Sequence, residues 1–130
     1  MSGLKGSINN DLYIRLDRQQ NQLEFIHFVW RGLVEAVNTE YSCWLHFRDI
    51  NSDVYPDDDT AFVDFDGEKF EVYIDKRLNT GTVMDYIIHE LAHVGSWFVN
   101  EEDDHGPMFG VEYARLYRRY LELYDEFWDV

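Results

Sequence analysis

Hydrophobic residues recur at helical spacing in three stretches of the chain. In the first, residues 20 to 38, apolar side chains fall three or four positions apart, which is the pattern of a helix that buries one face. The second covers about residues 83 to 97, and the third starts at Pro107 and continues to the C-terminus. We therefore predict one helix near the N-terminus and two helices in the second half of the chain. The predicted core positions of the first helix are Leu23, Ile26, Trp30, Leu33 and Val37.

Two stretches between these helices alternate apolar and polar residues, which is typical of strands with one buried face. In residues 42 to 48 the predicted inward side chains are Cys43, Leu45 and Phe47. Residues 61 to 75 contain Asp66-Gly67, a favoured two-residue turn between the strands of a hairpin. A turn at this place predicts the pairs Phe65 with Glu68, Asp64 with Lys69, Val63 with Phe70 and Ala61 with Val72.

The order of these elements predicts an α+β fold with a small, mostly antiparallel sheet. We find no internal repeat and no linker, so residues 1–130 are treated as one domain. Glycine and asparagine residues interrupt the pattern near the start, and residues 1 to about 20 are expected to be loosely ordered. Residues 51 to 60 include three consecutive aspartates after Pro56. They lack the alternating ligand spacing of a calcium loop, which favours a solvated turn.

The charge of the chain narrows the range of partners. With 26 acidic and 11 basic residues among 130, the formal net charge is -15. Phosphates would be repelled, so direct binding to nucleic acid or to an anionic membrane is not expected, whereas a basic protein or peptide is. The single cysteine, Cys43, excludes an internal disulfide and a cysteine-rich metal site. No apolar run has the length of a signal peptide or a membrane span, which predicts a cytoplasmic protein.

Candidate chemistry is concentrated in residues 89 to 93, which read His-Glu-Leu-Ala-His. On a helix, His89 and His93 project from the same side, so their imidazoles can bind one metal ion. Glu90 lies one position further round the helix, where it can reach a water molecule without being a ligand. A catalytic zinc site has three protein ligands and one open position. The pattern therefore predicts a zinc peptidase with Glu90 as general base and one further ligand.

Two residues compete for the place of the third ligand. One class of zinc peptidases continues the motif with Gly and His at positions that here hold Ser96 and Val99, so that class is excluded. His105 follows a short loop and stands just before the last predicted helix, from where it can fold back over residues 89 to 93. Other zinc peptidases take a glutamate from a later helix, and Glu112 is the candidate for that arrangement.

Several accessory roles have more than one candidate. An oxyanion needs a hydrogen-bond donor, and Tyr113 and Tyr117 are both suitable. A carboxylate often orients a metal-bound imidazole. The candidates for that role are Asp85, Asp103 and Asp104. If the strand at residues 70 to 74 lies at the edge of the sheet, an extended substrate can pair with it as an additional strand. The acidic surroundings predict a preference for basic peptides.

The segments HELAH at residues 89–93 and HGPMF at residues 105–109 together resemble the SprT-like (Spartan-type) family of zinc metallopeptidases. In that family the last ligand is the histidine that opens the HGPxF segment. The resemblance implies His89, His93 and His105 as zinc ligands and Glu90 as the catalytic acid and base. It also implies a zincin-like order of one helix, a small sheet with a hairpin and two helices. The chain differs from DNA-directed relatives in its acidic charge and in having no cysteine-rich zinc ribbon.

Two other functions are compatible with the same sequence features. A non-catalytic acidic protein, such as a nucleic-acid mimic that occupies a basic partner, would also explain the charge. A hydrolase acting on a non-peptide bond would share the same metal site. Three further residues are expected to serve the fold. They are His27 beside the first helical stripe, His46 on a strand surface and Cys43 as a small inward-facing side chain.

Overall fold

The structure, a computed structural model, describes residues 6–9, 20–48, 50, 61–99 and 105–129. Its elements are β1 (Gly6–Asn9), α1 (Gln20–Ala36), β2 (Ser42–Arg48), β3 (Ala61–Phe65), β4 (Lys69–Asp75), α2 (Thr80–Gly95) and α3 (Pro107–Trp128). The fold is α+β, and the predicted helices and strands occur in the predicted order. The predictions for residues 51–60, and those for Asp103 and Asp104, lie outside the described residues.

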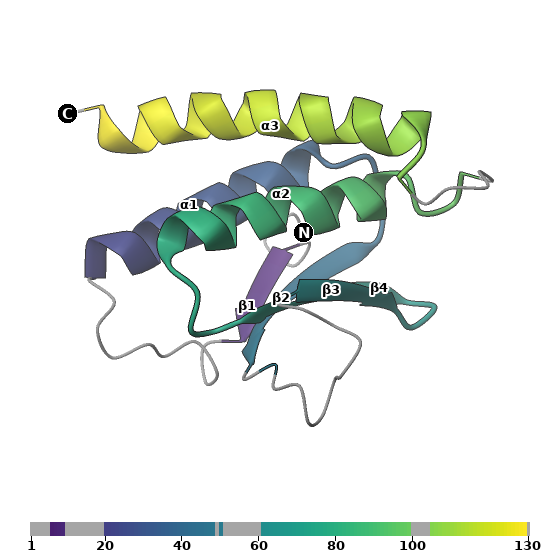
Figure 1. Ribbon diagram of the computed structural model, residues 1–130, viewed down its shortest axis with the longest axis horizontal. Coiled ribbons are helices and arrows are strands. Elements are labelled where there is room, and N and C mark those ends of the chain that lie inside the picture. Colours follow the sequence, from purple (N-terminus) through teal and green to yellow (C-terminus); the bar gives the residue numbers. More distant parts are fainter. Residues whose placement is uncertain (1–5, 10–19, 49, 51–60, 100–104, 130) are drawn as a thin grey trace.

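The described elements form three layers (Figure 1). Helices α1 and α2 lie side by side over one face of the sheet, and α3 lies across them on the side away from the sheet. The helices of the middle layer therefore have neighbours on two sides. This position explains why α1 buries more than the predicted stripe. Besides the predicted Ile26, Trp30 and Leu33, its buried side chains include Phe25, Val29 and Val34. Val37, just after the helix, is buried as predicted, whereas Leu23 is only half-buried.

The sheet is mixed, with the strand order β1-β2-β4-β3. Strands β1 and β2 are parallel, as are β2 and β4, and only β3 and β4 are antiparallel. The prediction of a mostly antiparallel sheet is therefore wrong. Local patterning predicts a hairpin, but it cannot show that α1 connects β1 to β2 as a crossover, which makes those strands parallel. Because β4 lies inside the sheet, residues 70–74 are not an edge strand. The edge on that side is β3.

Strand β1 corrects a second expectation. Residues 1 to about 20 were expected to be loosely ordered, but Gly6–Asn9 pair with Cys43–His46 of β2. Four residues interrupted by glycine and asparagine carry too little alternation to predict a strand, and the pairing depends on a partner that is remote in sequence.

The hairpin has a different register from the predicted one. Phe65 pairs with Phe70 rather than with Glu68, which moves the whole ladder by two residues. A type I′ turn at Asp66-Gly67 would need a positive φ at both positions, but among described residues only Gly67 has one, at 96°. Gly67 is instead the first of the two central residues, as in a type II′ turn. The Asp66 carboxylate accepts hydrogen bonds from the backbone N–H groups of Glu68 and Lys69 and pairs with Lys69 Nζ.

Candidate metal centre

Helix α2 provides two of the three histidines, and its start is fixed by Asn79. The Asn79 side chain accepts a hydrogen bond from the backbone N–H of Thr82 at 2.9 Å, which satisfies one of the free N–H groups of the first turn. The helix begins at Thr80, three residues before the predicted start at about residue 83, so Thr82 lies inside its first turn.

The position of α2 in the middle layer separates its side chains into buried and accessible faces. Met84, Ile87, Ile88, Leu91 and Ala92 are buried. His89 and His93 are only half-buried, so the face that they share remains accessible to a ligand.

The three histidines predicted from the sequence meet in one place. One ring nitrogen from each of His89, His93 and His105 lies within 4.8 Å of the other two, close enough for a single metal ion. The Nε2 atoms of His89 and His105 are 3.4 Å apart. Two nitrogens bound to one tetrahedral zinc stand about 3.3 Å apart, because each Zn–N bond is about 2.0–2.1 Å long. The donor set and this spacing fit zinc. We call these three residues the histidine group.

Phe109 supports the histidine group from α3. Its ring centroid lies 5.1 Å from that of His89, 4.6 Å from that of His93 and 4.8 Å from that of His105. Gly106 is the extended N-cap residue of α3, and Pro107 occupies the first turn, where its missing N–H costs no hydrogen bond. This start places His105 immediately outside the helix and Phe109 one turn inside it, so both side chains reach α2. The helical spacing of Phe109 within the last predicted helix indicated only a core position, so its contact with the three histidines was not expected.

Glu90 occupies the border between the accessible and the buried faces of α2. It is only 6% exposed, in contrast to the half-buried His89 on one side of it. Ile87 and Val94, three positions before and four after Glu90, share its helical face and are also buried. Glu90 therefore does not share the accessible face of His89 and His93, but lies on the side of α2 that carries Ile87 and Val94.

Glu112, the alternative third ligand, belongs to a different group of contacts. Its carboxylate accepts two hydrogen bonds from the Arg115 guanidinium, at 2.9 and 3.0 Å, and one from the backbone N–H of Asn38 at 3.3 Å. It is 5% exposed and lies against Gly95, where a Cβ atom would overlap Glu112 Oε1. We call Glu112, Arg115 and Asn38 the glutamate group. The metal-ligand cluster found among the described residues contains the three histidines and not Glu112.

The two tyrosine candidates lie at increasing distances from the histidine group. The rings of Phe109 and Tyr113 are 6.0 Å apart, and those of Tyr113 and Tyr117 are 6.2 Å apart, so Tyr113 is nearer by one helical turn. Burial, followed by the charge of Asp85 on α2, raises the pKa of Tyr113. Its hydroxyl therefore keeps its proton at neutral pH and remains a hydrogen-bond donor.

The other two histidines of the described chain have different surroundings. His46 is buried on the face of the sheet away from the helices, where its ring stacks on Tyr73 and its Nε2 lies 3.2 Å from a carboxylate oxygen of Glu71. Burial lowers the pKa of His46, although Glu71 acts in the opposite direction. Burial and the charge of Arg31 lower the pKa of His27 on α1. Neither belongs to the metal-ligand cluster.

Comparisons of the chain with protein-family profiles, with curated proteins and with solved structures found no match. The SprT-like resemblance thus stays a prediction based on residues 89–93 and 105–109. No helix within the described residues combines the length and the apolar character that a membrane span requires.

Proposed function

We propose that this chain is a zinc-dependent metallopeptidase of the zincin-like, SprT-like type, acting on protein or peptide substrates in the cytoplasm. The observation that carries the proposal is the convergence of His89, His93 and His105, with ring nitrogens from α2 and from the start of α3 within 4.8 Å. Three neutral imidazoles are a ligand set that leaves a tetrahedral zinc one open position.

The reaction requires a base beside the metal site. Zinc held by the histidine group would supply a Lewis acid that lowers the pKa of water toward neutrality and polarises the scissile carbonyl. Glu90 then takes the proton from the attacking water and delivers it to the leaving amine. A carboxylate suits this role because it is ionised at neutral pH. The border position of Glu90, beside His89 but shielded from bulk solvent, favours proton exchange with a reacting water over exchange with solvent.

Tyr113 is the better candidate for stabilising the oxyanion. It is one turn closer to the histidine group than Tyr117, and its raised pKa keeps the hydroxyl protonated. A neutral donor of this kind can bind the negative charge that develops on the carbonyl oxygen.

Strand β3 offers a place for the substrate backbone. Among the described strands it lies at the edge of the sheet, next to β4, and it packs under α2, the helix that carries His89 and His93. An extended peptide can pair with such an edge as an additional strand. The net charge of -15 favours basic peptides at this edge.

The direct test is proteolysis of unstructured peptides, basic and acidic in matched pairs, by zinc-loaded protein. Glu90→Gln keeps the size of the side chain but removes the base, and we expect the cleavage rate to fall by about 10²–10⁴-fold. Glu35→Gln, a change of the same type at an exposed position of α1, should leave the rate unchanged. Unaltered cleavage by the Glu90 variant would exclude the mechanism, and equal cleavage of basic and acidic peptides would exclude the charge preference.

The charge also supports a second candidate, a non-catalytic acidic protein that binds a basic partner. Such a protein needs no stoichiometric zinc, and its binding would be insensitive to Glu90→Gln. Zinc content measured beside partner binding therefore separates the two functions.

A further inference from the structure

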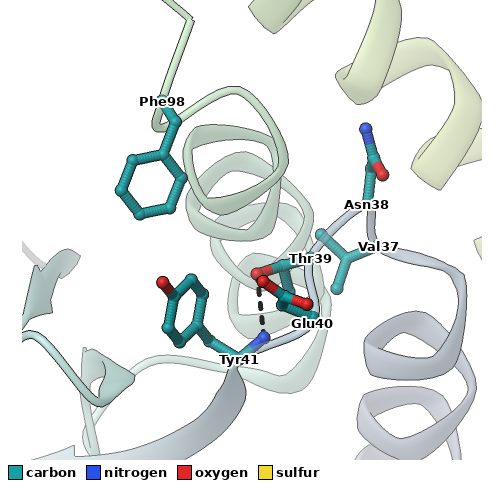
Figure 2. Close-up of a pocket in the computed structure, with 6 residues that line it drawn as sticks. All are labelled: Val37, Asn38, Thr39, Glu40, Tyr41 and Phe98. Atoms are coloured by element: carbon teal, nitrogen blue, oxygen red, sulfur yellow. Dashed lines mark hydrogen bonds between the residues drawn. The ribbon is translucent and has the colours of Figure 1, made fainter.

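A pocket of about 500 Å³ lies where the C-terminal ends of α1 and α2 come together (Figure 2). Helix α1 ends at Ala36 and α2 ends at Gly95. The residues that line the pocket follow these two ends, and none of them belongs to the histidine group. They are Val37, Asn38, Thr39, Glu40, Tyr41 and Phe98.

Two aromatic rings form one side of the pocket. The rings of Tyr41 and Phe98 face each other with centroids 5.8 Å apart (Figure 2). Phe98 is 64% exposed, which is unusual for a phenylalanine ring next to a concave surface. Phe65 holds both rings in place, with its own ring 5.0 Å from Tyr41 and 5.4 Å from Phe98. The faces of aromatic rings attract organic cations.

The electrostatics of the pocket also favour a cation. The C-terminal end of a helix carries a partial negative charge of about half an electron, and here two such ends converge. Glu40 adds a full negative charge, and within the described part of the chain its carboxylate has no ion-pair partner. None of the described residues that line the pocket is a lysine or an arginine. Arg115, which is linked to Asn38 through Glu112, is already engaged by that carboxylate.

The pocket is reached from the end of the edge strand. Phe65 is the last residue of β3, and its ring touches both aromatic rings of the pocket. Phe98 lies three residues beyond the end of α2, the helix that carries His89 and His93. Because an extended chain covers about 3.3 Å per residue, a peptide paired with β3 can place a side chain here a few residues from the scissile bond.

We propose that this pocket binds the alkylammonium or guanidinium group of a basic side chain in the polypeptide substrate. The proposal rests on the proposed function, since it treats the pocket as a distal subsite of the same cleft. The aliphatic part of lysine or arginine packs on Val37 and the two rings, and the charged end is bound by Glu40 and the helix ends. An anion would be repelled by Glu40 and by the ends of both helices. A neutral side chain would gain only the apolar contacts.

Binding can be tested without catalysis by titrating the isotope-labelled protein with N-acetyl-lysine amide and following backbone amide signals by NMR. We expect shifts at Thr39, Glu40 and Phe98, and weaker binding of the uncharged N-acetyl-norleucine amide. Glu40→Gln should weaken lysine binding by about two- to fivefold, and Phe98→Leu by a similar factor of about two to five. Glu35→Gln, which removes the same charge from an exposed site on α1, should leave the affinity unchanged.

Kinetics then connect the pocket to the substrate. A series of peptides carries a single lysine, placed at a different distance from the scissile bond in each. We expect a lower KM for the peptide whose lysine reaches the pocket. Glu40→Gln should raise that KM to the value of the other peptides while leaving kcat unchanged. The assignment of the pocket as a cation site would be overturned if the lysine and norleucine amides bound equally well. It would also be overturned if Glu35→Gln lowered the affinity for the lysine amide as much as Glu40→Gln. Tighter binding of free 1,4-diaminobutane than of the lysine peptides would overturn its assignment to a substrate side chain. Lysine-amide binding by a protein that cleaves no peptide would refute the peptidase and leave the cation pocket standing.

Discussion

The histidine group and the glutamate group both lie against α2, yet they differ in what their atoms contact. In the histidine group, three ring nitrogens from two elements approach one point on an accessible face. In the glutamate group, a buried carboxylate receives three hydrogen bonds from Arg115 and from the backbone of Asn38. The first set of atoms is arranged as a donor set for a cation. The second is a completed charge pair that joins α3 to the end of α1.

This difference favours His105 over Glu112 as the third ligand that the sequence left open. His105 and Glu112 are seven residues apart, and both are chemically suitable for zinc. Which of them reaches His89 and His93 depends on how α3 is rotated about its axis. The close approach of Glu112 to Gly95 shows that Glu112 packs against the last turn of α2. The histidine group and the glutamate group should therefore respond differently to metal and to mutation.

The largest expected effect is the response of stability to zinc. A ligand present at about 100 to 1,000 times its Kd raises the free energy of unfolding by about 2.7–4.1 kcal/mol. We expect a gain of this size for the wild type in urea denaturation with zinc rather than a chelator. His89→Ala should abolish the zinc-dependent gain. Glu112→Gln should lower the free energy of unfolding both with zinc and with the chelator, but the difference between the two should remain. A zinc-dependent gain that survives His89→Ala would show that the metal binds elsewhere.

The next effect tests the contact of Glu112 on α3 with Gly95 on α2. Gly95→Ala puts a Cβ atom where Glu112 Oε1 lies, so we expect a loss of about 2 kcal/mol in the free energy of unfolding. Gly110→Ala is the matched control, because a Cβ there has nothing within 4 Å. It should instead stabilise α3 by about 0.5–1 kcal/mol, because alanine loses less backbone entropy in a helix than glycine. Equal effects of the two changes would contradict the packing described for Glu112.

A smaller effect is expected from removing the partner of the buried carboxylate. Arg115→Ala takes away two of the three hydrogen bonds to Glu112, but Arg115 is 43% exposed, so water can replace part of what is lost. We expect about 1–2 kcal/mol of destabilisation in thermal or chemical unfolding. Arg118→Ala, at an exposed position of the same helix, should change stability by less than about 0.5 kcal/mol. Neither variant should alter zinc affinity, and a change in it would mean that the two groups are coupled.

The smallest effect concerns pH and a histidine outside both groups. Burial holds the pKa of His46 below its ordinary value of 6.5, so the unfolded chain takes up a proton at this residue before the folded protein does. The contribution of His46 to stability is complete above pH 6.5 and decreases as the pH falls through that value. In metal-free protein, His46→Gln should therefore lose stability less steeply than the wild type between pH 7 and pH 5. A steeper loss in the variant would contradict the burial of a neutral His46.

Sequence reasoning identified the elements and the three histidines because their patterns are local. The helical stripe of α1, the alternation of β2 and the four-residue spacing of His89 and His93 each depend on neighbours in the chain. Pairings between distant segments were not predictable in the same way. Strand β1 and the parallel pairing of β2 with β4 depend on how the chain crosses over the sheet.

The burial of Glu90 was not predictable from local pattern. Helix α2 contacts both the sheet and α3, so more of its surface is covered than a single apolar stripe indicates. Apart from Val37, the residues of the cation pocket carried no periodic or motif signal, since they follow two helix ends that are about 60 positions apart in the sequence.

The central claim is tested most directly by measuring zinc per chain in purified wild type, His105→Ala and Glu112→Gln by elemental analysis after dialysis against metal-free buffer. The account predicts about one zinc per chain in the wild type and in Glu112→Gln, and a marked loss in His105→Ala, since a catalytic zinc site needs three protein ligands. A wild type without zinc, or a loss confined to Glu112→Gln, would contradict it.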